Sequence, residues 1–300
     1  MKMLKALIKR NVKLFFKDKG MFFTALITPL ILLVLYAVFL KEVYANAFLA
    51  GMPEGLTIDG DVLDGLVGGQ LISSLLAVSC VTVAFCSNFL MVQDKANGVL
   101  RDLKMTPVSA RVLALGYYGA TLFATLIICY AAMVISLLYL LAVGFHLSFA
   151  DVLLLFLDVT LLSLFGVALS SVVNFFLTTQ GQISAVGSIV SSSYGFICGA
   201  YMPISSFGEF LQKVVTFLPG TYGTSLLRNH AMRGALDELG ANGIPDEVTT
   251  TLADMVDANI YFFGSRVEDY AMYLILGGAT ALLVAAYVAL NIFKNRSKGK

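Results

Sequence analysis

Hydrophobic residues form long runs along this chain, and short segments rich in charged residues, glycine and proline separate the runs. A run of about 20 apolar residues is long enough to cross a bilayer as a helix. The pattern predicts six transmembrane helices, at residues 22–40, 66–92, 113–143, 152–173, 183–202 and 271–293. The predicted fold class is therefore an all-α polytopic membrane protein.

The composition is that of a membrane protein, since 58% of the 300 residues are hydrophobic and only 13% are charged. A soluble domain carries about 25% charged residues. All four cysteines fall within apolar runs, without the spacing of a metal site or a redox pair. We expect them to be small hydrophobic residues in packed helices.

Residues 1–20 are strongly basic and predict an amphipathic helix, because leucine, isoleucine, valine and phenylalanine recur there at helical spacing. Such a helix lies on the anionic cytoplasmic leaflet of a membrane. A cleaved signal peptide is the alternative, but the apolar run that follows exceeds the roughly 7–15 residues of a signal core. We therefore expect residues 22–40 to remain as the first span.

The distribution of positive charge predicts how the chain crosses the membrane. Of the 20 Lys and Arg residues, seven lie in residues 1–20, four in residues 93–111, and four at the tail, namely Lys294, Arg296, Lys298 and Lys300. Segments rich in Lys and Arg stay in the cytoplasm. We therefore expect both termini inside the cell, in a protein of the plasma membrane.

Residues 93–111 form a charged segment between the second and third predicted spans. Val99, Leu100 and Leu103 fall on one side of a short helix. Thr106 and Pro107 end that helix, because a residue before proline is disfavoured in the α region. Two interpretations are open: the segment only connects two spans, or its helix docks with a partner in the cytoplasm.

Residues 204–227 are too apolar for a water-exposed loop and, between Pro203 and Pro219, too short to span a membrane. They predict a re-entrant hairpin at the outer side between the fifth and sixth spans, with Glu209 on its polar face. The acid-rich residues 229–269 predict a polar extracellular cap.

Two ionisable side chains toward the predicted outer side of the membrane are candidates for a function. Asp158 is the only carboxylate well inside a predicted span, which indicates a proton relay or a substrate contact. It also lies only about two turns from Asp151, so solvation near the outer interface is the favoured alternative. His230, between Arg228 and Arg233, could bind an anion, but a solvated loop is the favoured interpretation.

Small residues recur every four positions in the fifth predicted span, at Gly187, Ser191, Gly195 and Gly199. This spacing lets another helix approach closely. Packing within the chain, a subunit interface and a substrate path are all compatible with it.

The sequence carries no phosphate-binding GxxxxGK[ST] loop, no HExxH and no GxSxG motif. We therefore expect this chain not to be an enzyme and to bind no cofactor, metal or nucleic acid. Transport, scaffolding and sensing remain as the candidate functions.

Two segments resemble a known family. DKANGVL at residues 94–100 and MTPVS at residues 105–109 are similar to the cytoplasmic loop of ABC-2 type permeases, the membrane subunits of bacterial ABC exporters of drugs, lipids and polysaccharides. GAYMP at residues 199–203 and LPGTY at residues 218–222 are similar to the outer re-entrant hairpin of that family. Lys95 stands where the family often has a glutamate, and residues 229–269 are longer than in minimal members, which leaves the substrate class open.

The resemblance implies a coupling helix that docks on a separate cytoplasmic ATPase. The residues it assigns to this coupling are Asp94, Asn97, Gly98, Val99, Leu100, Leu103, Thr106 and Pro107. Two permease chains, identical or related, would pair with two ATPase subunits, and ATP and Mg would bind to the ATPases. The surrounding lipids are the remaining partner.

The resemblance also implies a substrate path along the second and fifth spans. The candidate packing or path residues are Gly187, Ser191, Gly195, Gly199 and Asp158, and those of the hairpin are Pro203, Glu209, Pro219 and Arg228. The expected activity is export of a drug, a lipid or another amphiphile or glycan. An ion-coupled secondary transporter and a non-transporting membrane sensor or scaffold are the alternatives.

Overall fold

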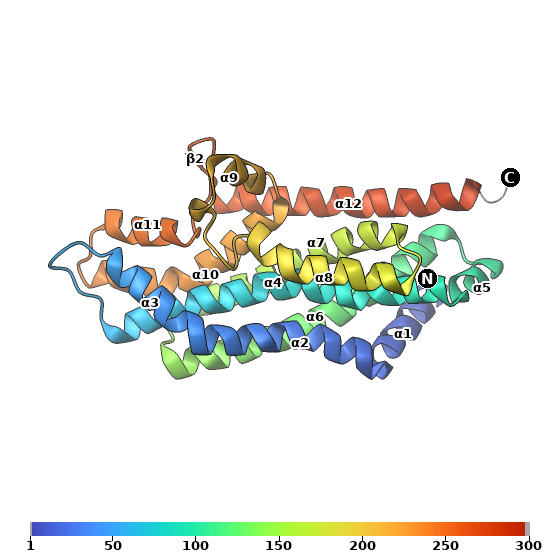
Figure 1. The fold of residues 1–300 in the computed structure, drawn as a ribbon, viewed down its shortest axis with the longest axis horizontal. Coiled ribbons are helices and arrows are strands. Elements are labelled where there is room, and N and C mark those ends of the chain that lie inside the picture. The colour runs from blue at the N-terminus through green and yellow to red at the C-terminus, as the bar shows by residue number, and fades with distance from the viewer. Residues whose placement is uncertain (1, 298–300) are drawn as a thin grey trace.

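Long helices lying side by side make up most of residues 2–297, the part of the chain that the computed structural model describes (Figure 1). The elements are α1 (Lys2–Lys17), α2 (Lys19–Leu35), the π-helical turn η1 (Tyr36–Leu40), α3 (Lys41–Ala50), α4 (Gly60–Ala96), α5 (Val99–Met105), α6 (Ala110–Val143), α7 (Phe149–Phe176), α8 (Gln180–Ile197), the 3₁₀ turn η2 (Ile204–Ser206), α9 (Glu209–Thr216), α10 (Pro219–Ala241), α11 (Asp246–Met255), β1 (Tyr261–Phe262), β2 (Ser265–Arg266) and α12 (Asp269–Ser297). Lys298 and Lys300, which belong to the predicted cytoplasmic tail, lie outside the described residues.

Five helices within the described residues are long and apolar enough to cross a membrane. They are Lys19–Ala50, Gly60–Ala96, Ala110–Val143, Phe149–Phe176 and Asp269–Lys294. The predicted class, an all-α polytopic membrane protein, is therefore confirmed. The helix at the fifth predicted span, α8, has 18 residues and is rich in Gly, Ser and Gln, so the count of six spans stays a prediction.

The centre of the bundle is α4, which is buried along most of its length and contacts α2, α6, α7, α8 and α10. Glycines bring the neighbouring backbones close to each other. A Cβ atom at Gly69 would lie 2.5 Å from the carbonyl oxygen of Ala231 in α10, and one at Gly166 of α7 would lie 2.9 Å from the carbonyl oxygen of Cys80. Close packing of this kind is how helices associate in a membrane.

The first predicted span ends later than expected. The helix continues from Lys19 to Ala50 through Pro29 and the turn η1, whereas the predicted span ends at residue 40, before Lys41 and Glu42. Lys and Glu are good helix formers, and the Lys41 Nζ atom lies 2.9 Å from a carboxylate oxygen of Asp64 in α4. The charges therefore sit on the helix and do not end it.

The region between α8 and α12 also differs from its prediction. The short elements η2 and α9 lie between Pro203 and Pro219, but α9 exposes the apolar side chain of Phe210, at 81%, and buries Val215. Pro219 then begins α10, a position where its missing N–H costs nothing. Because α10 runs to Ala241, the start of the predicted polar cap at residue 229 is wrong, since it falls inside a largely buried helix.

Figure 1 places both ends of the described chain at the same end of the bundle as α5. The loop of residues 51–59 and α11 lie at the opposite end. The basic segments of the sequence thus gather at one end, and the acidic α11 lies at the other.

We predict that Gly69→Ala destabilises the bundle, because the new methyl group would meet the backbone of α10. Overpacking of a core typically costs about 1–3 kcal/mol, so the thermal unfolding midpoint in detergent should fall. Gly277→Ala in α12 is the matched control, since its methyl group would have no atom within 4 Å. An equal midpoint for the two variants would contradict the close packing of α4 on α10.

Candidate functional site

An ion pair between the partly exposed Arg10 and the buried Asp94 joins α1 to the end of α4. The Arg10 guanidinium donates to both carboxylate oxygens of Asp94, with Nη1 at 2.7 Å and Nη2 at 3.3 Å, and the Tyr117 hydroxyl donates to Asp94 at 2.6 Å. The hydrogen bond to Asp94 raises the pKa of Arg10 above its ordinary value. Asp94 was predicted to belong to the ATPase contact, but its side chain is buried and holds α1 against α4 and α6.

The side chain of the neighbouring Lys95 also binds to groups of the chain itself. Its ammonium group donates to the backbone carbonyls of Asn174, Phe175 and Leu177, at 2.7, 2.8 and 3.0 Å. These carbonyls belong to the end of α7, where a helix leaves its last acceptors without intrahelical donors. The Asp-Lys pair, which departs from the usual family pattern, thus fixes two neighbouring helices to α4.

The amphipathic helix α1 uses its apolar side to contact protein. Leu7 lies against Gly116, and Ile8 lies against Gly119, both in α6. Phe15 is also buried, whereas the lysines of α1 are exposed. The predicted helix is confirmed, but its apolar face covers α6, and the sequence pattern could not show which apolar surface it would meet.

The short helix α5 begins after Gly98, whose φ of 81° lies in the left-handed region that favours glycine. Leu100 and Leu103, predicted as anchors for the ATPase, pack instead against a cluster of the chain's own residues that contains Leu7, Leu113 and Tyr287. We call this the basal cluster. The two leucines, like Val99, are therefore half-buried against the chain's own residues, and their assignment to an ATPase contact stays a prediction.

The exposed surface of this loop is mostly polar, and Met105 is its largest exposed apolar side chain. Met105 is 73% exposed, and the residues exposed around it are Asn97, Arg101, Asp102, Lys104, Thr106 and Pro107. Of the predicted coupling residues, Asn97, Thr106 and Pro107 thus lie on the surface, with Met105 as the apolar side chain that the sequence analysis missed.

Farther along the bundle, Asp158 of α7 is buried and has two protein partners. Its carboxylate lies 2.6 Å from Nδ1 of His230 and accepts a hydrogen bond of 2.7 Å from the Tyr273 hydroxyl. His230 is only 2% exposed, so its interpretation as a solvated loop residue is wrong. Asp158 is only 1% exposed, because α10 and α12 cover it, so its interpretation as a solvated carboxylate near the interface is likewise wrong.

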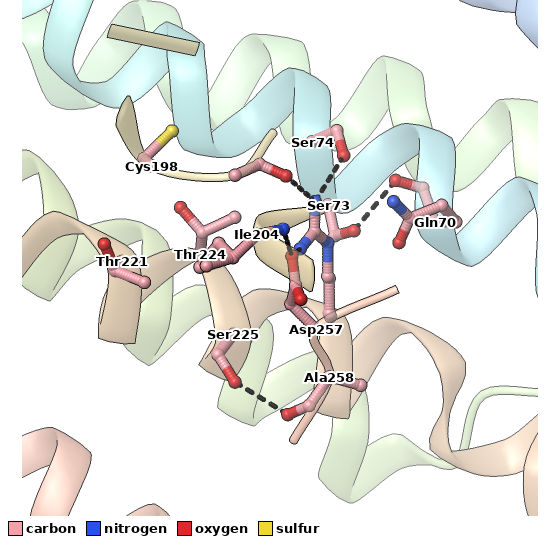
Figure 2. A network of polar contacts seen from close by, with 12 residues as sticks. Gln70, Ser73, Ser74, Cys198, Ile204, Thr221, Thr224, Ser225, Asp257 and Ala258 are labelled. Atoms are coloured by element: carbon pink, nitrogen blue, oxygen red, sulfur yellow. Dashed lines mark hydrogen bonds and ion pairs between the residues drawn. The ribbon is translucent and has the colours of Figure 1, made fainter. Parts of the chain in front are cut away.

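Arg228 belongs to a second buried network, of which Figure 2 labels Ser74, Ile204 and Asp257. Its guanidinium donates to the Ser74 hydroxyl at 3.3 Å and to the Gly199 carbonyl, and Nη1 lies 3.5 Å from Asp257. Asp257 in turn accepts the backbone N–H of Ile204 at 2.6 Å. Burial raises the pKa of Asp257, and the charge of Arg228 opposes that shift.

This network joins α4, α10 and two connecting segments, so the predicted hairpin residue Arg228 links parts of the chain distant in sequence. Removing one member of a buried ion pair is costly, since the other charge stays buried without a partner. Pro203, directly before Ile204, and Pro219, at the start of α10, bound the same region, while Glu209 is exposed on α9.

The predicted stripe of small residues in α8 divides into two parts. Gly187 lies against the Phe89 ring of α4, as expected for a packing face, and Ser191 is half-buried beside it. Gly195 instead faces the Tyr201 ring, and Gly199 has a φ of 74° beyond the end of the helix. The prediction of a continuous packing face is therefore wrong for Gly195 and Gly199, which shape the turn after α8.

An apolar cavity of about 600 Å³ lies between α4, α7, α8, α10 and α12. Phe85, Phe165 and Val190 line it together with Leu282, which is 73% exposed. Ser193, Tyr194 and Thr221 are the hydroxyl-bearing residues of the lining, and the surface that they present to the cavity is apolar. Mostly apolar walls with a few polar groups are typical of sites for small hydrophobic ligands.

The comparison with protein families identifies the class. The chain matches the family model of the ABC-2 type transporter over residues 2–231. It therefore belongs to the ABC-2 type transporter family and is a multi-pass membrane permease of an ABC transporter. No curated protein matches the chain. Membership favours this class over an ion-coupled transporter and over a sensor or scaffold.

We predict that Asp94→Asn loosens α1, because it removes the charge that Arg10 and Tyr117 meet. A hydrogen bond to a charged group contributes about 1.5–3 kcal/mol. Hydrogen exchange of the amides in residues 2–17 should accelerate in the variant. Asp102→Asn, an exposed acid in α5, is the control and should leave the exchange unchanged. Equal exchange in the native chain and in Asp94→Asn would show that the ion pair does not hold α1.

Proposed function

We propose that this permease is the membrane half of an ATP-driven exporter and that α5 is its contact with a separate ATPase. The observation that carries this proposal is the way α5 packs on the rest of the bundle. Its outer surface presents Met105 among polar side chains, while Leu100 and Leu103 connect it to the basal cluster. A displacement of α5 by the ATPase would therefore also displace α1, α6 and α12, because these helices contribute residues to the same cluster.

The proposed assembly contains two permease chains and two ATPase subunits. ATP and Mg would bind to the ATPases, and this chain would contribute no catalytic group. The exposed ridge of Ser184, Ser188 and Ser192 on α8 supports a contact with the second permease or with the substrate path, because small side chains allow a close approach. This assignment makes α8 the fifth of six spans.

The orientation follows from charge. The end of the bundle that carries α1 and α5 holds the basic segments, which are retained in the cytoplasm of membrane proteins. We therefore assign both termini to the cytoplasmic side of the plasma membrane, where an ATPase has access to nucleotide. Export is the direction that the family resemblance implies.

The proposed substrate is hydrophobic or amphiphilic. The walls of the 600 Å³ cavity are almost entirely apolar, and an apolar wall gives a glycan no partners for its hydroxyl groups. Leu282 of α12 lines the cavity and is also exposed at the surface of the bundle. A drug-like or lipid-like molecule could therefore enter from the bilayer.

We predict that Met105→Asp weakens copurification of the ATPase with the permease. Loss of an apolar anchor at an interface commonly costs about 2 kcal/mol, which corresponds to roughly thirtyfold weaker binding. Phe263→Asp is the matched control, because Phe263 is 74% exposed in the turn between β1 and β2, and β2 lies far from α5 in Figure 1. Normal recovery of ATPase with Met105→Asp would contradict docking at α5.

A second prediction concerns the substrate. Ala279 of α12 lines the cavity, so Ala279→Phe should fill part of it and strongly reduce transport of a hydrophobic dye by the reconstituted complex. ATPase copurification should stay normal, since the site is far from α5. The control is Ala285→Phe, an exposed position on the same helix. Equal transport by both variants would exclude the cavity from the substrate path.

A further inference from the structure

A second cavity, of about 380 Å³, lies at the α5 end of the bundle, where α4, α5, α6, α7 and α12 converge. Four basic residues line it: Lys95, Arg101, Lys104 and Lys294. None of its described lining residues is an aspartate or a glutamate. We call this cavity the basic pocket.

Two of the positive charges are held beside one aromatic ring. Nζ of Lys294 lies 4.8 Å from the centroid of the Phe175 ring, and Nζ of Lys95 lies 5.5 Å from the same centroid. Lys104 lines the same cavity. The fold thus concentrates like charges, and the three carbonyls that bind Lys95 fix its position.

Asp94, although adjacent to Lys95 in sequence, does not neutralise this group. Its carboxylate is engaged by Arg10 and by the Tyr117 hydroxyl. A concave site with one sign of charge and low-dielectric walls attracts counter-ions strongly. The electrostatics of the basic pocket therefore favour an anion.

The walls of the pocket identify what kind of anion fits. Leu113, Phe175 and Tyr287 give it apolar surface next to the basic groups. The pocket also lies where the membrane-length helices α4, α6 and α12 meet polar loops, which is the level of lipid headgroups. A free phosphate ion would use the charges but leave the apolar surface uncovered.

We propose that the basic pocket binds the phosphate-bearing headgroup of an acidic membrane lipid, with the glycerol and upper acyl region of the lipid against Phe175 and Tyr287. The bound headgroup neutralises the cluster of cations. It also connects α5 to α12, because Arg101 belongs to the first and Lys294 to the second. The lipid therefore stabilises the position of α5.

The test uses the purified full-length permease in detergent and measures its thermal unfolding midpoint. The probes are short-chain dioctanoyl phosphatidylglycerol, dioctanoyl phosphatidylcholine and glycerol 3-phosphate, all at equal concentration. The pocket variant is Arg101→Gln with Lys294→Gln. The matched control is Lys9→Gln with Lys13→Gln, which removes two exposed charges from α1.

We expect phosphatidylglycerol to raise the midpoint of the native chain and of the α1 control by several degrees and to have no such effect on the pocket variant. Phosphatidylcholine and glycerol 3-phosphate should leave all three unchanged. If the double variant does not fold, Lys294→Gln alone replaces it, since Lys294 is exposed, and Lys294→Arg should restore the shift.

Three results would overturn the proposal. An equal shift in the pocket variant would place the lipid elsewhere, and an equal shift with phosphatidylcholine would remove the role of charge. An equal shift with glycerol 3-phosphate would make the pocket a site for soluble phosphates. The measurement involves no ATPase and no transport, so it is independent of the proposed function.

Discussion

The burial of α4 on nearly all sides is the constraint on which the bundle depends. A polar side chain buried away from water must find a hydrogen-bond partner or destabilise the fold. Along α4, Ser74 meets Arg228 of α10, Asn88 donates to Ser170 of α7 at 3.1 Å, and Asp94 meets Arg10 of α1. Each partner comes from a different helix. Ser74, Asn88 and Asp94 therefore help to specify which helix packs at each level, which apolar contacts alone do not.

This arrangement connects the two ends of the molecule. At one end of α4, Asp94 and Lys95 hold α1 and α7, and α5 follows directly in the chain. Toward the other end, Ser74 contacts the network of Arg228, which holds the turn after α8 (Figure 2). A rigid helix held at both levels can transmit a displacement of α5 to the region around the apolar cavity. The same helix contributes residues to that cavity.

The sequence predicted the elements better than their surroundings. Long apolar runs located five helices of membrane length, and Pro107 predicted the end of the short helix of the charged loop. Periodicity shows that Leu100 and Leu103 share a face of this helix but not what covers that face. The pairing of His230 with Asp158 joins positions far apart in the chain. Charge and polarity around His230 favoured a loop, and only the path of α10 through the bundle buries it.

In the proposed orientation, the end of the bundle that carries α5 faces the compartment of the ATPase, and the opposite end lies outside. Single cysteines at Asn97 and Ala241 test this most directly, because both positions are exposed and lie at opposite ends. The four native cysteines are buried, so they give a low background. In intact cells, a membrane-impermeant thiol reagent should label Ala241→Cys, and should label Asn97→Cys only after the membrane is opened. Labelling of both positions from outside would contradict the orientation and, with it, docking of an ATPase at α5.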